Sequence, residues 1–131
     1  MGLDQYLYKV NKGTVEEYEE RLKKLNEKYP IWNEDFQKEH DEMCEYFGKE
    51  EITTWRKYYK LDDLITDLFY EKGGSGDFNC RYVELNEEDI IYIIEDIEDD
   101  DDTDVEYTLE ILEKCLKYIE NGYKIWYSNW Y

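Results

Sequence analysis

An aromatic run, Tyr123-Lys124-Ile125-Trp126-Tyr127-Ser128-Asn129-Trp130-Tyr131, follows Asn121-Gly122, which is typical of the end of a helix. Aromatic and β-branched residues favour strands, so this run predicts one. The segment Leu3-Asp4-Gln5-Tyr6-Leu7-Tyr8-Lys9-Val10 has the same character, and alternation places Tyr6, Tyr8 and Val10 on one face. We therefore predict a sheet in which strands near both termini pair.

Helical patterns occupy most of the sequence between these two strands. Thr14 and Glu17 have the spacing of a capping box, and apolar residues at three- and four-residue steps predict a helix from Val15 to Tyr29, which stops before Pro30. The same reasoning predicts helices over 33–47 and 61–72, a helix capped by Asn86, and a last helix opened by a second capping box, Thr103 with Glu106.

Two further segments, 51–59 and 80–85, are extended by propensity, although a helix could also start inside the first. Gly73-Gly74-Ser75-Gly76 is a loop too short to separate domains. The chain of 131 residues is then one domain, residues 1–131. We predict an α+β fold: a single small domain whose antiparallel sheet, including strands near both termini, is covered by four to five helices.

The charge of the chain is concentrated in one block. Between Arg81 and Lys114 lie fifteen Asp and Glu and no Lys or Arg, and residues 95–104 alone hold eight carboxylates. Such a density disfavours the compact state through repulsion, and folding alone does not require it. It predicts a cationic partner, and the alternative of a solvated acidic linker stays open. The carboxylates predicted to bind are Glu95, Asp96, Glu98, Asp99, Asp100, Asp101, Asp102, Asp104, Glu106, Glu110 and Glu113.

Composition excludes several other classes of protein. A net charge of -19 repels nucleic acid and anionic membranes, so we expect neither as a direct partner. Aromatic residues make up 18% of the chain, which argues against disorder. We expect exposed aromatics to add apolar contacts to a partner, with Trp55, Tyr58, Tyr59 and Trp130 as the candidates. Three widely spaced cysteines fit reduced thiols and a cytoplasmic protein.

No motif in the sequence indicates a cofactor. The only histidine, His40, is one helical turn from Cys44, and two ligands do not make a zinc site, so we predict no metal centre and no cofactor. The run from Asp99 resembles a calcium loop, but Asp104 stands where that loop needs glycine. Weak divalent binding by the acidic run stays an open alternative. We do not expect an enzyme; that third hypothesis predicts a pocket around His40 or Arg56.

Four short segments carry a resemblance to known proteins: Gly2-Leu3-Asp4-Gln5-Tyr6-Leu7-Tyr8-Lys9, Trp55-Arg56-Lys57, Asn79-Cys80 with Tyr82-Val83, and Tyr127-Ser128-Asn129-Trp130. Together they resemble a family of small uncharacterised phage and prophage accessory proteins. The resemblance implies a phage accessory gene and no particular activity.

We therefore predict a phage-type inhibitor of a host defence nucleoprotein, acting as an acidic mimic of nucleic acid. The expected partner is a basic nucleic-acid-binding protein of the host, either a CRISPR effector or a restriction enzyme, whose groove the carboxylates block. The alternative is a protein-binding accessory or scaffold module that uses its Tyr and Trp surface, with the charge serving solubility. Affinity for a partner depends on salt in the first hypothesis and hardly at all in the second.

Overall fold

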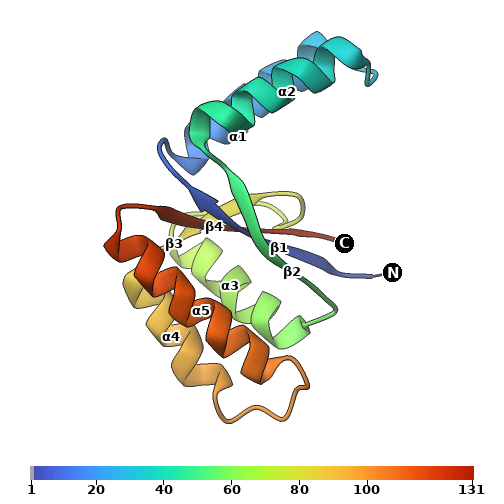
Figure 1. Ribbon diagram of the computed structural model, residues 1–131. Helices are drawn as coiled ribbons and strands as arrows, with labels where there is room; N and C mark the ends of the chain where they lie inside the picture. Colours follow the sequence, from blue (N-terminus) through green and yellow to red (C-terminus); the bar gives the residue numbers. More distant parts are fainter. Residues whose placement is uncertain (1) are drawn as a thin grey trace.

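The computed structural model describes residues 2–131, which form one antiparallel sheet of four strands and five helices (Figure 1). The strands are β1 (Asp4–Val10), β2 (Glu50–Arg56), β3 (Tyr82–Leu85) and β4 (Lys124–Trp130), in the order β2-β1-β4-β3. The two strands nearest the termini pair at the centre of the sheet, with Asp4 opposite Trp130 and Val10 opposite Lys124. The predicted α+β fold and its terminal strands are confirmed.

Helices α1 (Val15–Lys28) and α2 (Glu34–Phe47) form a hairpin that projects from one side of the sheet (Figure 1). The Thr14 hydroxyl accepts the N–H of Glu17 at 3.1 Å and so caps α1. Asn33 caps α2 in the same way. Gly48, with φ 64°, ends α2 in the left-handed conformation that glycine adopts without steric cost.

Helices α3 (Tyr59–Glu71), α4 (Glu87–Ile97) and α5 (Val105–Glu120) cover the other face of the sheet (Figure 1). Asn86 and Asp89 form a capping box at the start of α4. Helix α3 begins two residues before the predicted Leu61, and β3 begins at Tyr82 rather than at the predicted Cys80. Such shifts at element ends are small beside the agreement in element type and order.

Alternation along β4 divides the buried residues into two cores. Tyr127 points to the large core, which α3, α4 and α5 build with residues such as Ile65, Ile93 and Leu112. Trp126 points to the opposite face and packs in a smaller core at the base of the α1–α2 hairpin, whose other buried members are Val10, Val15, Tyr18, Met43 and Phe47. Adjacent residues of one strand therefore anchor two separate packing layers.

A buried polar network lies at the end of the sheet where β4 meets α3. The carboxylate of Asp62, 1% exposed, accepts hydrogen bonds from the Tyr127 hydroxyl at 2.7 Å, from Asn129 Nδ2 at 2.8 Å and from the Tyr131 hydroxyl. Gln5 Nε2 donates to the Tyr127 oxygen at 2.9 Å and extends the network to β1. Several donors satisfy this buried acid, so it fixes the position of α3 against both central strands.

Candidate functional site

The predicted carboxylates lie on α4, α5 and the loop between them. Apolar residues on one side of each helix, including Ile90, Ile97 and Val105, are buried against the sheet and turn the opposite side outward. Nine of the eleven predicted carboxylates are exposed, and Asp100 and Asp104 are half-buried. The structure therefore presents most of the predicted site at the surface.

The end of α4 is acidic where helix electrostatics favours basic residues. Glu95 and Asp96 occupy its last turn, which has no Lys or Arg, and Glu98 is its C-cap residue. Unpaired carbonyl groups give a helix C-terminus a partial negative charge, so each carboxylate there costs a few tenths of a kcal/mol or more. These acids therefore destabilise the helix that carries them.

The acidic loop, residues 98–104 between α4 and α5, is stabilised by hydrogen bonds between its own backbone N–H groups and its own carboxylates. The N–H of Asp104 donates to Asp102 Oδ1 at 2.9 Å, and the N–H of Asp101 donates to Asp100 Oδ1 at 2.8 Å. The predicted Thr103–Glu106 capping box is wrong: Asp104 is the N-cap residue of α5, and its side chain makes no capping bond. Asp102 forms the turn instead: its Oδ1 accepts the N–H of Asp104 and its carbonyl accepts the N–H of Val105, so α5 begins one residue later than a Thr103 cap requires.

The eleven predicted carboxylates are not neutralised from within. The ion pairs among residues 2–131 involve none of the eleven carboxylates. Residues 87–120 carry fifteen acids and two lysines, Lys114 and Lys117, and thus a net charge of -13 out of -19. A surface of this kind attracts cations at distances up to about the Debye length of ~8–10 Å.

Two of the predicted aromatic contacts are wrong. Trp55 and Tyr58 are only 5% and 1% exposed. The alternation of β2 turns Trp55 toward α5, where its Nε1 donates to Thr108 Oγ1 at 2.8 Å. Tyr58 lies beneath the acidic loop, and its buried hydroxyl has no hydrogen-bond partner among residues 2–131. Burial, and then the charges of Asp100, Asp102 and Asp104, raise the pKa of Tyr58 to about 12.

The other two aromatic candidates, Tyr59 and Trp130, are exposed by 49% and 56%. Trp130 follows Asn129, which faces α3, so the alternation of β4 places Trp130 on the opposite face from the acidic helices. Trp130 therefore lies apart from the eleven predicted carboxylates.

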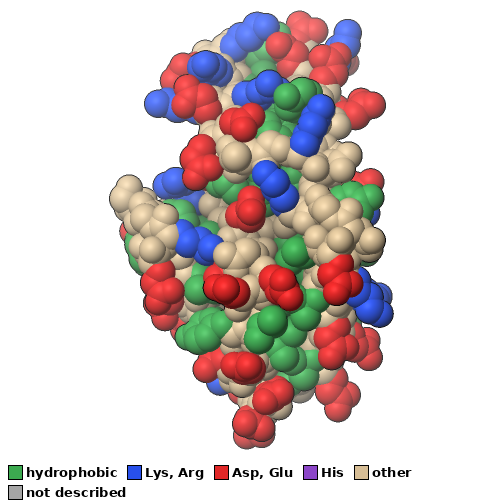
Figure 2. Space-filling model, turned by 90° about the vertical axis from the view of Figure 1, so that its left-hand side faces the viewer, with side chains coloured by type: hydrophobic (Ala, Val, Ile, Leu, Met, Phe, Trp, Pro, Cys, Tyr) green, Lys and Arg blue, Asp and Glu red, His purple; other side chains and the backbone are tan. Residues whose placement is uncertain are grey.

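Sequence reasoning missed three apolar side chains that do lie on the acidic helices. Ile91 and Tyr92 of α4 are 40% and 47% exposed, and Tyr107 of α5 is 46% exposed. On the face shown in Figure 2, acidic and hydrophobic side chains are interleaved over the lower part of the molecule, and most Lys and Arg lie higher. The sequence held one signal for the exposure of Ile91: at three- and four-residue steps it shares a helix face with Glu88 and Glu95. The surrounding run of isoleucines obscured this spacing. We call Ile91, Tyr92, Tyr107 and the eleven carboxylates the acidic surface.

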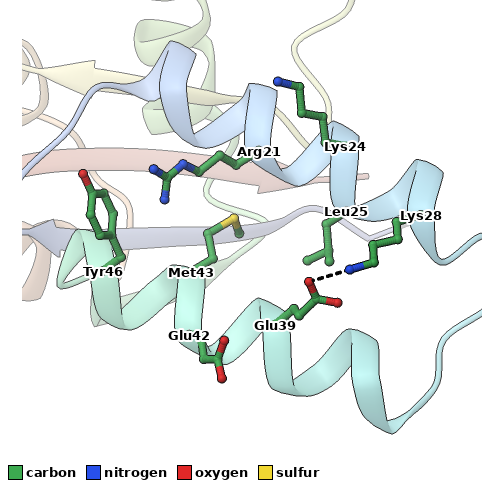
Figure 3. Close-up of a pocket in the computed structure, with 8 residues that line it drawn as sticks. All are labelled: Arg21, Lys24, Leu25, Lys28, Glu39, Glu42, Met43 and Tyr46. Atoms are coloured by element: carbon green, nitrogen blue, oxygen red, sulfur yellow. Dashed lines mark hydrogen bonds and ion pairs between the residues drawn. The ribbon is translucent and has the colours of Figure 1, made fainter.

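Two hollows of the molecule lie away from α4 and α5. A groove of about 370 Å³ runs between α1 and α2 and is bordered by Arg21, Lys24 and Lys28, the last paired with Glu39 at 3.0 Å (Figure 3). A second hollow of about 380 Å³ borders Arg56, which pairs with Asp4 at 3.8 Å. Among residues 2–131 no group of three or more His, Cys, Asp or Glu side chains is arranged to hold a metal ion.

Comparison of the chain with protein-family models, curated proteins and solved structures gives no match. None of the helices in residues 2–131 is long and apolar enough to cross a membrane. The site must therefore be interpreted from its own chemistry, which is a set of unpaired carboxylates with apolar side chains between them.

Proposed function

We propose that this protein is an acidic mimic of nucleic acid that occupies the basic groove of a nucleic-acid-binding protein and blocks it. The observation that supports the proposal most is the unpaired acid at the end of α4, where Glu95, Asp96 and Glu98 oppose the helix dipole without a compensating cation in that turn. A cationic partner would supply the missing charge.

The geometry of the acidic surface suits such a partner. Glu106, Glu110 and Glu113 follow one another along α5 at four- and three-residue steps, which is one charge per ~4.5–6 Å of a helix that rises ~1.5 Å per residue. One strand of duplex DNA carries one charge per ~3.4 Å of axis, so α5 presents a sparser row of the same sign. Ile91, Tyr92 and Tyr107 supply apolar area between the charges. In this scheme the carboxylates accelerate and orient the encounter, and burial of the apolar side chains slows dissociation.

The target that we propose is a defence nucleoprotein of a bacterial host, a CRISPR effector or a restriction enzyme, with a phage or prophage as the source of the inhibitor. The chain would act in the cytoplasm of the host, where such targets work. Nucleic acid itself is not a ligand in this proposal, because the net charge repels it.

Competition with DNA tests the proposal directly. A fluorescent duplex would be bound to a purified CRISPR effector complex or restriction enzyme and titrated with the protein at about 50 mM and about 200 mM salt. We expect displacement that weakens at the higher salt. The variant with Asn at Asp99, Asp100, Asp101 and Asp102 should bind about tenfold or more weakly, since exposed charge pairs contribute about 0.2–1 kcal/mol each.

A matched control removes the same number of charges from the hairpin: Glu16, Glu27, Glu42 and Glu45 changed to Gln, all exposed and without ion pairs among residues 2–131. We expect this variant to compete nearly as well as the parent protein. Equal losses in the two variants would show that only total charge matters, and unchanged affinity and salt dependence in the loop variant would eliminate the mimic.

The alternative, a protein-binding module whose charge serves solubility, is favoured by one observation at the tip of the hairpin. Ile31 and Trp32, between α1 and α2, are 82% and 62% exposed, far above the exposure of the core residues. Exposed large apolar residues on a projecting tip are typical of contact sites for other proteins. Loss of partner binding in Ile31→Ser with Trp32→Ser, and not in the loop variant, would favour this second function.

A further inference from the structure

The three cysteines occupy three different environments. Cys115 is fully buried in the large core, and burial raises the pKa of its thiol to about 12. Cys80 is exposed, and its thiol donates to Oδ1 of its neighbour Asn79 at 3.6 Å. Cys44 is half-buried and belongs to a cluster of polar groups that neither of the others has.

The cluster around Cys44 is assembled from three parts of the fold. His40 lies one turn earlier on α2, with its Nδ1 3.9 Å from Cys44 Sγ. The Tyr18 hydroxyl, from α1, lies 3.9 Å from the same sulfur. The ammonium of Lys49, just after α2, donates to the oxygens of Tyr18 and Tyr82, at 2.9 Å each.

Local structure holds Lys49 in this position. The left-handed Gly48 reverses the chain at the end of α2, and the N–H of Lys49 then donates to the carbonyl of Cys44 at 3.0 Å. Its ammonium lies over the rings of Tyr8, Tyr18 and Tyr82, with 4.2, 4.7 and 4.8 Å to the ring centroids. It forms no ion pair among residues 2–131, so its charge acts on the cluster without a neutralising carboxylate.

These groups favour the thiolate form of Cys44. Burial acts to raise the pKa of the thiol, but the hydrogen bond and charge of His40, with the charge of Lys49, outweigh burial and leave that pKa lowered. The hydrogen bond to Cys44 raises the pKa of His40 and outweighs burial and the Lys49 charge, which both lower it, while the carboxylate of Asp41 acts in the same direction as Cys44. The Lys49 ammonium also polarises the Tyr18 hydroxyl, which can donate to the sulfur.

We propose that Cys44 is a reactive thiolate and a site of oxidative modification by hydroperoxides, activated by His40, Tyr18 and Lys49. The thiolate attacks one peroxide oxygen, the O–O bond breaks and an S–O bond forms. The leaving hydroxide takes the proton of the His40 imidazolium. With hydrogen peroxide the products are Cys44 sulfenic acid, water and neutral His40: sulfur loses two electrons and the peroxide gains them.

Alkylation of the intact protein tests the activation, with Cys80 as a control in the same molecule. Iodoacetamide would be added over about pH 6–9, and the rate at each cysteine followed by peptide mass spectrometry. At the acid end we expect Cys44 to react at least about tenfold faster than Cys80, and the ratio should fall toward the alkaline end, where ordinary thiols also form thiolate. A Cys44 that reacts no faster than Cys80 throughout this range overturns the proposal.

The variant His40→Gln distinguishes activation from simple access. It keeps a polar side chain of the same helix face but removes the imidazolium, so the rate at Cys44 in acid should fall by about tenfold while Cys80 is unchanged. Lys49→Met should lower the same rate in the same direction. If either variant unfolds by circular dichroism, the other provides the test, and unchanged pH profiles in a folded variant count against the cluster.

Peroxide itself is the final test. The parent protein would be treated with hydrogen peroxide in the presence of dimedone, which traps sulfenic acid, and the labelled cysteines identified by mass spectrometry. We expect the label on Cys44 and not on Cys80 or Cys115, with loss of that label in His40→Gln. Label on Cys80 at an equal or higher level, or none at Cys44, would contradict the proposal.

Discussion

The two helical parts on either side of the sheet differ in charge composition and in ion pairing. In the α1–α2 hairpin, residues 15–47 combine eleven acids with five Lys or Arg, and ion pairs such as Lys28–Glu39 join the two signs. In the part from α4 to α5, residues 87–120, fifteen acids meet two lysines and the acidic surface has no ion pair. Solubility alone would distribute acid evenly, so the contrast favours selection for a local potential.

The largest expected effect concerns the cores beneath these two parts. Phe47→Ala removes a fully buried ring from the small core, and we expect it to lower the free energy of unfolding by about 3–5 kcal/mol. Ile93→Ala in the large core should cost about 2–5 kcal/mol. Because Trp126 and Tyr127 join both cores to β4, urea denaturation should show one transition in each variant. A separate early transition in Phe47→Ala would mean that the hairpin unfolds on its own.

The next largest effect is on stability at alkaline pH, and it comes from Tyr58, which lies beneath the acidic loop. Burial and the loop carboxylates hold the pKa of Tyr58 at about 12 against an ordinary 10.0, so the unfolded state ionises first. The resulting stabilisation is complete below pH 10 and is lost as pH rises from 10 through 12, by up to about 2–3 kcal/mol.

The variant Tyr58→Phe should lose this part of the alkaline slope. At pH 7 it should be neutral or slightly stabilising, because the hydroxyl that it removes is buried without a partner among residues 2–131. Urea unfolding across this pH range measures both effects. An unchanged alkaline slope, or a large loss of stability at pH 7, would contradict this account of Tyr58.

A smaller effect separates the two charge patterns. Changing Asp99, Asp100, Asp101 and Asp102 to Asn should raise the free energy of unfolding at low salt by about 1 kcal/mol, since each like-charge contact costs a few tenths. The hairpin variant with Gln at Glu16, Glu27, Glu42 and Glu45 should gain less. Thermal unfolding at low and high salt measures both, and an equal gain in the two variants would show that charge repulsion does not differ between the hairpin and the acidic loop.

The smallest effect is expected at the tip of the hairpin. Ile31→Ser and Trp32→Ser should each change the free energy of unfolding by less than about 0.5 kcal/mol, because these side chains are largely exposed in the folded chain. A loss above about 1 kcal/mol would show that the tip supports the fold, and would weaken its interpretation as a contact site.

Sequence periodicity predicted the elements well because most of them have one buried face and a definite cap. Asn86 caps α4 as predicted, α2 matches the predicted range 33–47, and the predicted pairing of the terminal strands is found at the centre of the sheet. Periodicity could not tell which aromatics are exposed. Trp55 and Tyr58 lie in a segment whose burial depends on α5 and on the acidic loop, which are distant in sequence.

The sequence predicted the carboxylates of the candidate site, but it did not predict the apolar side chains that lie among them. A block of acid is visible in any sequence, and its exposure follows from the cost of burying charge. Ile91 and Tyr92 belong to a run of apolar residues in which no period is obvious, and the face that α4 turns to the sheet selects Ile90 and Ile93 for burial. The start of α5 was mispredicted because a turn formed by Asp102 stands where the Thr103 cap was expected.

The pairing of β1 with β4 has a consequence for how the chain folds. These strands are among the most distant segments in sequence, yet within residues 2–131 β1 has only β2 as a second partner and β3 pairs only with β4. The sheet thus cannot be completed until β4 leaves the ribosome, and most of its contacts are of high sequence separation, which slows folding. A chain interrupted before Lys124 would have one two-stranded ribbon and a lone strand with unpaired backbone groups, an aggregation-prone species rather than a smaller version of the fold.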